Sequence, residues 1–174
     1  MSAVGERNDL GQTPGERYRI LTAYRTIAMV GLSSNYYNPS SFAAVYLDAN
    51  GYDIVPVNPV SAGKREILGR PVYADLREAA ARHSCPIEIV DVFRPAHEAV
   101  DLAEQAIEIG AKVLWLQLGV INEKAAALAR DAGLSVVMDR CCKIEHARFF
   151  GGLRTIGLNT GVVTSRLGMR LPRD

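Results

Sequence analysis

The sequence predicts an α/β fold in which a doubly wound parallel sheet of about five strands lies between two layers of helices. Three observations support this prediction. Short, continuous apolar runs alternate with longer amphipathic segments, which is typical of strands covered on both faces by helices. A glycine follows three of the amphipathic segments, shortly before the next apolar run. The 174 residues, 48% hydrophobic and 22% charged, suffice for one buried core and are few for two domains.

The apolar runs are expected to form the strands. They lie at residues 26–32, 53–58, 87–93, 112–118 and 135–139. A short extra piece at residues 72–73 is considered as well. Right-handed helical crossovers between consecutive strands then make the sheet parallel.

The amphipathic segments are expected to form the helices, because Ala, Leu and Glu recur in them at helical spacing. Gly51, Gly110 and Gly133 stand where a left-handed C-cap is expected, and Asn122 is a candidate N-cap without a full capping box. The predicted helices lie at residues 40–50, 76–83, 96–109 and 122–132.

The two ends differ from the rest of the chain. Residues 1–14 have little apolar content, so we expect disorder there, followed by a short helix over residues 16–24. Residues 151–174 contain five glycines, four arginines and one acid. This C-terminal arm is expected either to pack as an extended segment or to dock on a second subunit, and the sequence leaves both open. The single predicted domain therefore spans residues 15–150.

Charge and hydropathy exclude several classes of partner. Twenty Lys and Arg against nineteen Asp and Glu leave a formal charge of +1, and the basic residues are scattered, which disfavours nucleic-acid binding. No stretch approaches the roughly 20 apolar residues of a membrane span, and the N-terminus lacks the apolar region of a signal peptide. We therefore expect a cytoplasmic protein that binds neither nucleic acid nor membrane.

The three cysteines are Cys85, Cys141 and Cys142. The number of cysteines is odd, and two of them are adjacent in sequence, which does not suit a disulfide framework. We therefore expect three reduced thiols. Cys142 and His146 have helical i, i+4 spacing, but no second ligand pair stands elsewhere, and we predict no metal.

The loops after the strands are the expected site, because ligands of open parallel sheets bind at the carboxyl ends of the strands. In the first loop, Gly31 permits a tight turn, and the hydroxyls, the amides and the following helix N-terminus offer donors to an anion. After the second strand, Asn58-Pro59 fixes an extended backbone, and Lys64 and Arg65 are either cations for a phosphate or solvated loop charges.

The remaining loops carry fewer signals. Arg94-Pro95 follows the third strand, and residues 117–119 (Gln-Leu-Gly) follow the fourth. The fifth strand leads into residues 139–143, which hold a carboxylate, cations and thiols. His146 is the histidine nearest this edge, and it more often serves as a hydrogen-bonded polar residue than as a catalyst. His83 and His97 fall on helices.

Several catalytic and cofactor motifs are absent from the sequence. It contains no P-loop, no G-x-S-x-G, no H-E-x-x-H and no nucleophile and base within one loop. A nicotinamide dinucleotide site also lacks support. The first loop has only Gly31 in place of G-x-G-x-x-G, and Asn58 stands where a ribose-binding acid belongs, while Asp53 lies at the start of that strand. The site therefore looks built to bind a ligand rather than to transform one.

Four stretches of the sequence together resemble a known family. They are similar to the small stand-alone CoA-binding proteins related to the N-terminal domain of the succinyl-CoA synthetase α subunit. The resemblance covers about residues 20 to 150. It is carried by GLSSN (31–35), NPSSFAAVYLDANGYDIVPVNP (38–59), IVDVFRP (89–95) and AKVLWLQLGVINEKAAALARDAGLSVVMDRCCKIEH (111–146).

The resemblance implies a Rossmann-like domain that binds coenzyme A, with the phosphates over the first loop and over the helix that begins near Ser40. Lys64 is similar to a lysine of the synthetase, but the spacing differs and Arg65 is an alternative. The other residues that match the family's loop motifs are Gly31, Ser33, Ser34, Asn35, Arg94, Pro95, Gln117, Leu118 and Gly119.

The absence of an acidic residue at the position of Asn58 also favours CoA over NAD, because the 3′-phosphate of CoA would repel a carboxylate there. The full set of predicted CoA-binding residues adds Ser40, Asn58 and Pro59 to those already named. The synthetase's phosphorylated histidine lies in a second domain for which this chain has no room, so ligase activity of the chain alone is not expected.

Three functions follow from these residues. The first is a non-catalytic module that binds CoA or an acyl-CoA. The second is a component of an acyl-CoA ligase or transferase that acts with a partner chain and uses Asp139, Cys141, Cys142 and His146. The third is an NAD(P)-binding, redox-responsive regulator. The first is preferred, and association into a homo-oligomer is left open.

Overall fold

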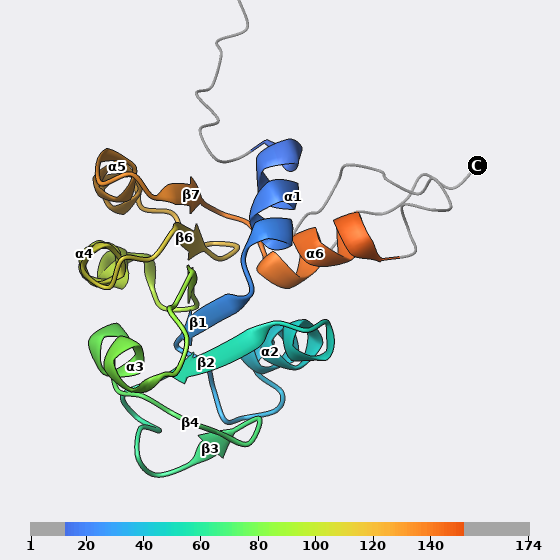
Figure 1. The fold of residues 1–174 in the computed structure, drawn as a ribbon, viewed down its shortest axis with the longest axis vertical. Helices are drawn as coiled ribbons and strands as arrows, with labels where there is room; N and C mark the ends of the chain where they lie inside the picture. The colour runs from blue at the N-terminus through green and yellow to red at the C-terminus, as the bar shows by residue number, and fades with distance from the viewer. Residues whose placement is uncertain (1–12, 152–174) are drawn as a thin grey trace, which may run out of the picture.

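The computed structural model describes residues 13–151. Five parallel strands form one sheet in the order β2-β1-β5-β6-β7 (Figure 1). All five lie within the apolar runs predicted from the sequence, so the predicted sheet is confirmed. The strands are β1 (Thr26–Val30), β2 (Asp53–Val57), β5 (Ile89–Val92), β6 (Val113–Leu116) and β7 (Ser135–Val137).

The strand order reverses between β1 and β5. The chain first passes from β1 outward to β2, and then returns to the other side of β1 to form β5, β6 and β7 in turn. A reversal of this kind opens a crevice at the carboxyl ends of the strands that flank it, and such crevices hold the ligands of open α/β sheets. The first place to look for a site is therefore the edge that carries the loops after β1 and β5.

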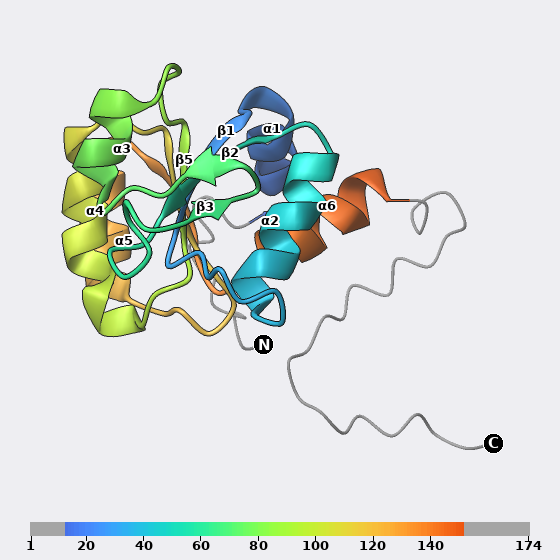
Figure 2. The same cartoon turned by 90° about the horizontal axis from the view of Figure 1, so that it is seen from below.

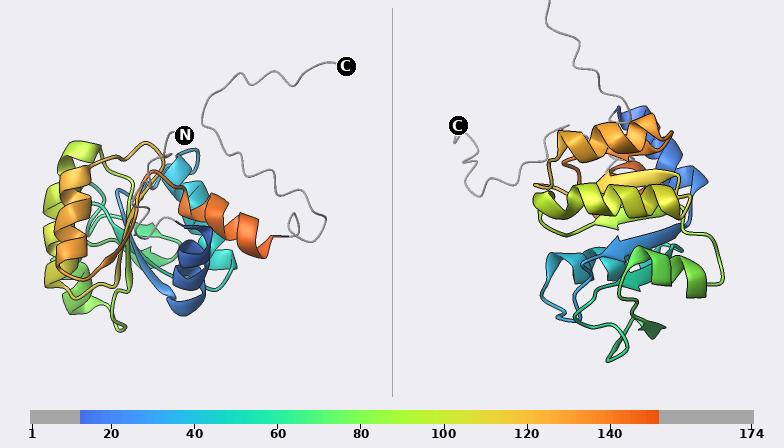
Figure 3. Two further views of the ribbon diagram at one scale, coloured as in Figure 1. Left: turned by 90° about the horizontal axis from the view of Figure 1, so that it is seen from above. Right: turned by 90° about the vertical axis from the view of Figure 1, so that its left-hand side faces the viewer.

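Helices cover both faces of the sheet (Figure 2). The two further views in Figure 3 show the same three-layer arrangement. One layer contains α1 (Pro14–Ala23), α2 (Pro39–Ala49) and α6 (Cys142–Phe150). The other contains α3 (Leu76–Arg82), α4 (Ala99–Glu108) and α5 (Glu123–Asp131).

Each face of the sheet has its own apolar core because side chains alternate along every strand. Val90 and Leu114 are buried beneath α4 and α5. Met29 and Trp115 are buried on the opposite face with residues of α1, α2 and α6. The sheet is thus buried on both sides, which explains why its strands are continuous apolar runs in the sequence.

The helix ends follow the signals in the sequence. Gly51, Gly110 and Gly133 adopt φ values of +86°, +74° and +90°, as expected for left-handed C-caps. The side chain of Asn122 accepts a 2.9 Å hydrogen bond from the amide of Ala125, which confirms the predicted N-cap.

Two elements were not predicted. Helix α6 follows β7 after a short loop. Its apolar residues, which follow the two adjacent cysteines, show no clear helical period. A small hairpin, β3 (Glu66–Ile67) and β4 (Arg70–Pro71), has strands of two residues each, too short for any periodic signal. The extra piece considered at residues 72–73 appears as a single parallel bridge between Tyr73 and Val57.

Other differences are small. The predicted helix over residues 96–109 begins with a 3₁₀ turn, η1 (Ala96–Glu98), before α4. The predicted disordered segment and the C-terminal arm lie outside the described residues, apart from Thr13, Pro14 and Gly151. Within residues 13–151, the helices are all too short or too polar to cross a bilayer.

Candidate functional site

The predicted binding residues come from four loops at the carboxyl edge of the sheet. The β1–α2 loop and the start of α2 supply Gly31, Ser33, Ser34, Asn35 and Ser40, and the segment after β2 supplies Asn58, Pro59, Lys64 and Arg65. The loops after β5 and β6 supply Arg94, Pro95, Gln117, Leu118 and Gly119. Within residues 13–151, hydrogen bonds between predicted residues join Ser33 to Ser40 and Asn35 to Ser33, and close packing brings Arg94 against Gly31.

The β1–α2 loop is held by its own side chains. The amide of Ser33 donates to Oγ of Ser40 over 3.1 Å, and the amide of Asn35 donates to Oγ of Ser33 over 3.0 Å. The Ser40 hydroxyl donates in turn to Oδ1 of Asn38 over 2.8 Å. The Ser41 hydroxyl faces the carbonyl oxygens of Ser33 and Asn35 at 2.7 and 2.8 Å. The loop is therefore pre-shaped at the N-terminus of α2, where backbone amides favour an anion.

Gly31 and Arg94 bring the loops after β1 and β5 into contact. Gly31 has φ +87°, and a Cβ atom there would lie 2.8 Å from Cδ of Arg94 and 3.3 Å from the carbonyl carbon of Phe93. Glycine is thus required both by the backbone conformation and by the arginine stem that crosses it.

The Arg94 guanidinium is already paired with a carboxylate. Its Nε and Nη2 atoms donate to the two carboxylate oxygens of Glu98, each over 2.8 Å. This hydrogen bonding raises the pKa of Arg94 and lowers the pKa of Glu98. Sequence reasoning did not identify Glu98, although its i, i+4 spacing from Arg94 was the available signal. An anion at Arg94 would have to share the guanidinium with Glu98.

Asn58 links the loop after β2 to the loop after β1. Its Nδ2 donates to the carbonyl oxygen of Leu32 over 2.9 Å, and its Oδ1 accepts from the amide of Val60 over 3.0 Å. Asn58 therefore fixes the relative position of two loops. Beyond it, Lys64 and Arg65 are exposed, and Lys64 Nζ donates to the carbonyl oxygen of Val60 over 3.4 Å.

Gln117 points into the protein instead of toward a ligand. It is buried, and its Nε2 donates to Oδ1 of Asp91 over 2.7 Å. Asp91 itself is fully buried in β5, and its Oδ2 has no hydrogen-bond partner among residues 13–151. Burial raises the pKa of Asp91 to about 7, against the opposing effect of the Gln117 hydrogen bond. Sequence reasoning missed Asp91, which was visible as a single acid in the apolar run IVDVF.

The loops after β6 and β7 are joined at the far side of the edge. The amide of Gly119 donates to Oδ1 of Asp139 over 2.8 Å, and Nε1 of Trp115 donates to the carbonyl oxygen of Arg140 over 2.8 Å. Asp139 adopts a left-handed φ of +57°, which turns the chain toward α6. Its carboxylate is thus engaged in holding this turn.

The thiols and the histidine considered for catalysis are poorly placed for it. Cys142 is fully buried, and burial raises the pKa of both Cys141 and Cys142. His146 is buried between α6 and α2 rather than exposed at the edge, with Nδ1 3.1 Å from the hydroxyl of Tyr46. Burial lowers the pKa of His146. These groups do not form a nucleophile–base pair in the structure.

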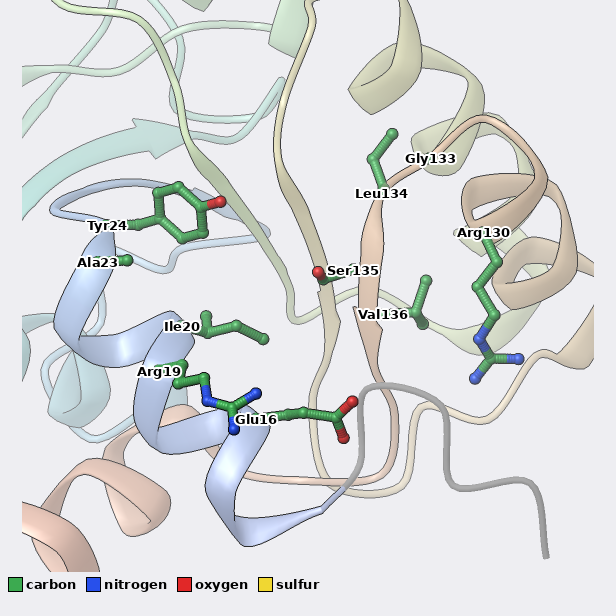
Figure 4. A pocket seen from close by; sticks show the side chains of 10 residues that line it. All are labelled: Glu16, Arg19, Ile20, Ala23, Tyr24, Arg130, Gly133, Leu134, Ser135 and Val136. Atoms are coloured by element: carbon green, nitrogen blue, oxygen red, sulfur yellow. The ribbon is translucent and has the colours of Figure 1, made fainter.

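Two cavities differ in their relation to this edge. One, of about 180 Å³, adjoins the β1–α2 loop and is lined by Ser33, Ser34, Tyr36, Ser41, Ala44, Val45, Glu66, Ile67 and Leu68. The other, of about 510 Å³, lies between α1 and the start of β7 and contains none of the predicted binding residues (Figure 4). Within residues 13–151, no three His, Cys, Asp or Glu side chains are grouped as metal ligands.

Comparisons with known proteins agree with this architecture. The Bacillus subtilis protein YneT is 37% identical over 128 residues, which cover 74% of this chain and 90% of YneT. The structure of a hypothetical protein from Pyrococcus horikoshii is 36% identical with a TM-score of 0.74, covering 87% of this chain and 100% of that one. A structure from Thermus thermophilus is 31% identical with a TM-score of 0.72, covering 79% and 99% of the two chains.

The family comparison covers both the sheet and its loops. The family described as the CoA binding domain matches residues 25–147, from just before β1 to within α6. The match therefore includes the β1–α2 loop, the Asn58 link and the loops after β5, β6 and β7. Because it extends over more than half of the sequence, the chain belongs to the CoA-binding domain family.

Proposed function

We propose that this protein binds coenzyme A or an acyl-CoA across the carboxyl edge of the sheet and does not itself transform it. The observation that carries the proposal is the pre-shaped β1–α2 loop at the N-terminus of α2, in which Ser33, Ser40 and Ser41 hold the backbone in place. An anion bound there would share the loop amides with the side-chain oxygens of Ser33, Asn38 and Ser40 that now accept from them, and it would not first have to order the loop. The pyrophosphate is the part of CoA that this loop would take.

Two exposed cations suit the third phosphate. Lys64 and Arg65 follow the Asn58 link, and neither forms an ion pair with any residue of the range 13–151. A 3′-phosphate adds charge on the ribose, so a pair of uncompensated cations beside the loop favours CoA over a ligand that lacks this group. Arg94 is a weaker candidate because Glu98 already pairs with it.

The structure supports CoA over a nicotinamide dinucleotide for a separate reason. The residue at the end of β2, where a ribose-binding carboxylate would stand, is Asn58. Its side-chain amide is already hydrogen-bonded to Leu32 and Val60. Gly31 is also the single glycine of the first loop, and the G-x-G-x-x-G pattern is absent.

Binding is favoured over catalysis by the state of the reactive groups. Cys142 and His146 are buried, the pKa of the Cys142 thiol is raised well above its ordinary value, and Asp139 holds the amide of Gly119. A cysteine nucleophile for thioester chemistry would need an accessible thiolate and a base to form it.

Isothermal titration calorimetry with CoA, dephospho-CoA and NAD tests the proposal. We expect CoA to bind most tightly, and the double variant Lys64→Ala/Arg65→Ala to lose about tenfold in CoA affinity while dephospho-CoA affinity changes little. Lys124→Ala, an exposed lysine on α5, is the matched control. Binding of NAD as tight as that of CoA would overturn the proposal.

A further inference from the structure

Strand β7 lies at one edge of the sheet, and in the part of the chain that the structure describes only β6 pairs with it. The amide of Ser135 donates to the carbonyl oxygen of Lys112, just before β6, over 2.9 Å. Because the backbone groups of successive strand residues point to opposite sides in the plane of a sheet, Val136 directs its N–H and C=O groups away from β6.

These two backbone groups of Val136 lie in the interior. The residue is 1% exposed, and no backbone hydrogen bond joins it to another element within residues 13–151. Buried N–H and C=O groups in folded proteins are almost always hydrogen-bonded. The outer side of β7 therefore calls for a partner that the described residues do not supply.

The cavity of about 510 Å³ lies along this outer side of β7. Ile20 and Ala23 of α1 border it on one side, and Arg130 of α5 borders it on the other (Figure 4). Helices α1 and α5 belong to opposite layers, so both faces of the sheet contribute a wall. The cavity thus has the position that one further strand would take, about 4.8 Å from β7.

The chain leaves the described residues close to this cavity. Phe150, the last residue of α6, stacks on Tyr18 of α1 with 5.4 Å between the ring centroids. Tyr18 directly precedes Arg19, which lines the cavity. Helix α1 stands between α6 and β7 (Figure 1), and its width is about 10 to 12 Å. Residues 152–160 span about 30 Å when fully extended, which is more than enough to pass it.

The sequence of the C-terminal arm contains a segment suited to a strand. Residues 160–165 read Thr-Gly-Val-Val-Thr-Ser and hold four of the six β-branched residues in the range 152–174. They carry no charge, and two adjacent valines would present one apolar side chain to each helix layer. Residues 1–12, which precede α1, contain a single β-branched residue, Val4. The C-terminal segment is therefore the better occupant.

We propose that residues 160–165 of the same chain form a sixth strand of the sheet, antiparallel to β7, in the cavity between α1 and α5. The orientation follows from the handedness of crossovers. The chain passes from β6 to β7 through α5 in one helix layer, whereas α6 lies in the other. A parallel strand beyond β7 that was reached through α6 would need a left-handed crossover, which is very rare, and an antiparallel strand avoids it.

This strand would cover the edge of β7. An uncovered edge offers unpaired backbone groups to other molecules, so the segment would protect the protein against pairing between sheets. The proposal does not depend on CoA binding, because the cavity contains none of the predicted binding residues.

Nuclear Overhauser contacts in the isotope-labelled full-length protein test the strand directly. We expect contacts between the backbone protons of residues 135–137 and those of residues 160–165, in the pattern of antiparallel strands. A mixture of labelled and unlabelled chains, filtered for contacts between molecules, should show none of them. Contacts of β7 with residues 1–12 or with a second molecule would overturn the proposal, and so would the absence of any contact between β7 and residues 160–165.

Hydrogen exchange at the Val136 amide provides a second test. The double variant Val162→Pro/Val163→Pro removes two backbone N–H groups and cannot form the ladder. We expect the Val136 amide to exchange at least about tenfold faster in this variant than in the wild type. Met169→Pro/Arg170→Pro places the same change beyond the segment and should keep the wild-type rate. Equal rates in the wild type and the Val162→Pro/Val163→Pro variant would refute the strand.

The amide of Val90 is the internal reference for both variants. It lies in β5, which pairs with β1 on one side and β6 on the other, so it should stay protected while the edge opens. Faster exchange at Val90 as well would mean that the whole sheet opens in the variant, and the contacts measured in the wild-type protein then decide.

Discussion

Asp91 lies beside Gln117 in the interior, where one carboxylate oxygen accepts a 2.7 Å hydrogen bond from the glutamine amide. The other oxygen has no hydrogen-bond partner in the part of the chain that the structure describes. By strand register Asp91 is opposite Met29 and Trp115, so its side chain projects into the apolar core beneath α6. Such surroundings disfavour the charged form of a carboxyl group, and burial raises the pKa of Asp91 to about 7.

This pKa makes folding stability depend on pH. Between an unfolded value of 3.8 and the folded value of about 7, the folded state binds more protons than the unfolded chain. The free energy of unfolding should therefore fall as pH rises through this window, by at most about 4 kcal/mol, and level off above it. Urea unfolding of the wild type and Asp91→Asn at pH 5 and pH 8 measures the effect.

Asp91→Asn should remove this component of the pH dependence, and the variant should be the more stable protein at pH 8. His146 has a lowered pKa and therefore contributes an increase in stability as pH rises. This contribution is common to both proteins, so it cancels in the difference between their free energies of unfolding. Parallel stability–pH curves for both proteins would rule out an ionising Asp91.

Gly31 and Gly51 offer a matched comparison of two left-handed glycines. Their φ values are +87° and +86°, but a Cβ at Gly31 meets Arg94 and Phe93, whereas a Cβ at Gly51 meets nothing within 4 Å. Gly31→Ala should destabilise the protein by about 1 to 2 kcal/mol more than Gly51→Ala. Thermal or urea unfolding of the two variants gives the difference, and an equal loss would mean that the Arg94 stem simply moves away.

A buried ion pair connects α1 to α6. Nε of Arg17 lies 2.8 Å from Oε2 of Glu145, with both side chains at most 4% exposed. Glu145→Ala leaves the arginine charge buried and should cost about 3 to 5 kcal/mol of stability. Glu108→Ala breaks the ion pair between Glu108 and Arg77, in which both side chains are at least half exposed. This change should cost no more than about 1 kcal/mol of stability. Similar losses at both sites would contradict the difference in burial.

Thiol reactivity should follow burial. Cys85 is exposed, Cys141 is partly buried and Cys142 is fully buried. We expect a maleimide to modify Cys85 rapidly, Cys141 slowly because burial raises its pKa, and Cys142 only after unfolding. Mass spectrometry of proteolytic fragments over a time course distinguishes the three, and early labelling of Cys142 would show that α6 opens readily.

The sequence predicts those parts of the fold that local patterns determine. The five strands are apolar runs bounded by turn residues, and Asn122 and Gly133 mark the two ends of α5 in sequence as they do in space. The β3–β4 hairpin was not predictable in this way because its strands are too short to show a period. Helix α6 was not predictable either, because its contacts come from α1 and α2, which are more than ninety positions away along the chain.

The candidate site was predictable as a set of loops but not as a set of contacts. Gly31 and Ser33 stand out in the sequence because the first loop of such a sheet needs a tight turn and donors. That Gln117 turns inward to Asp91, and that Arg94 is already held by Glu98, depends on side-chain directions that no linear pattern encodes. Glu66 appears in sequence as an ordinary loop acid, and only the folded hairpin places it in a cavity.

The hydrogen bond from Trp115 to the carbonyl oxygen of Arg140 gives the molecule an intrinsic optical reporter. This indole is the chain's single tryptophan, so its fluorescence is not mixed with that of any other. Its ring is shielded from solvent, yet its polar end touches the turn into α6. An event at that turn would therefore change the emission spectrum of the unlabelled protein.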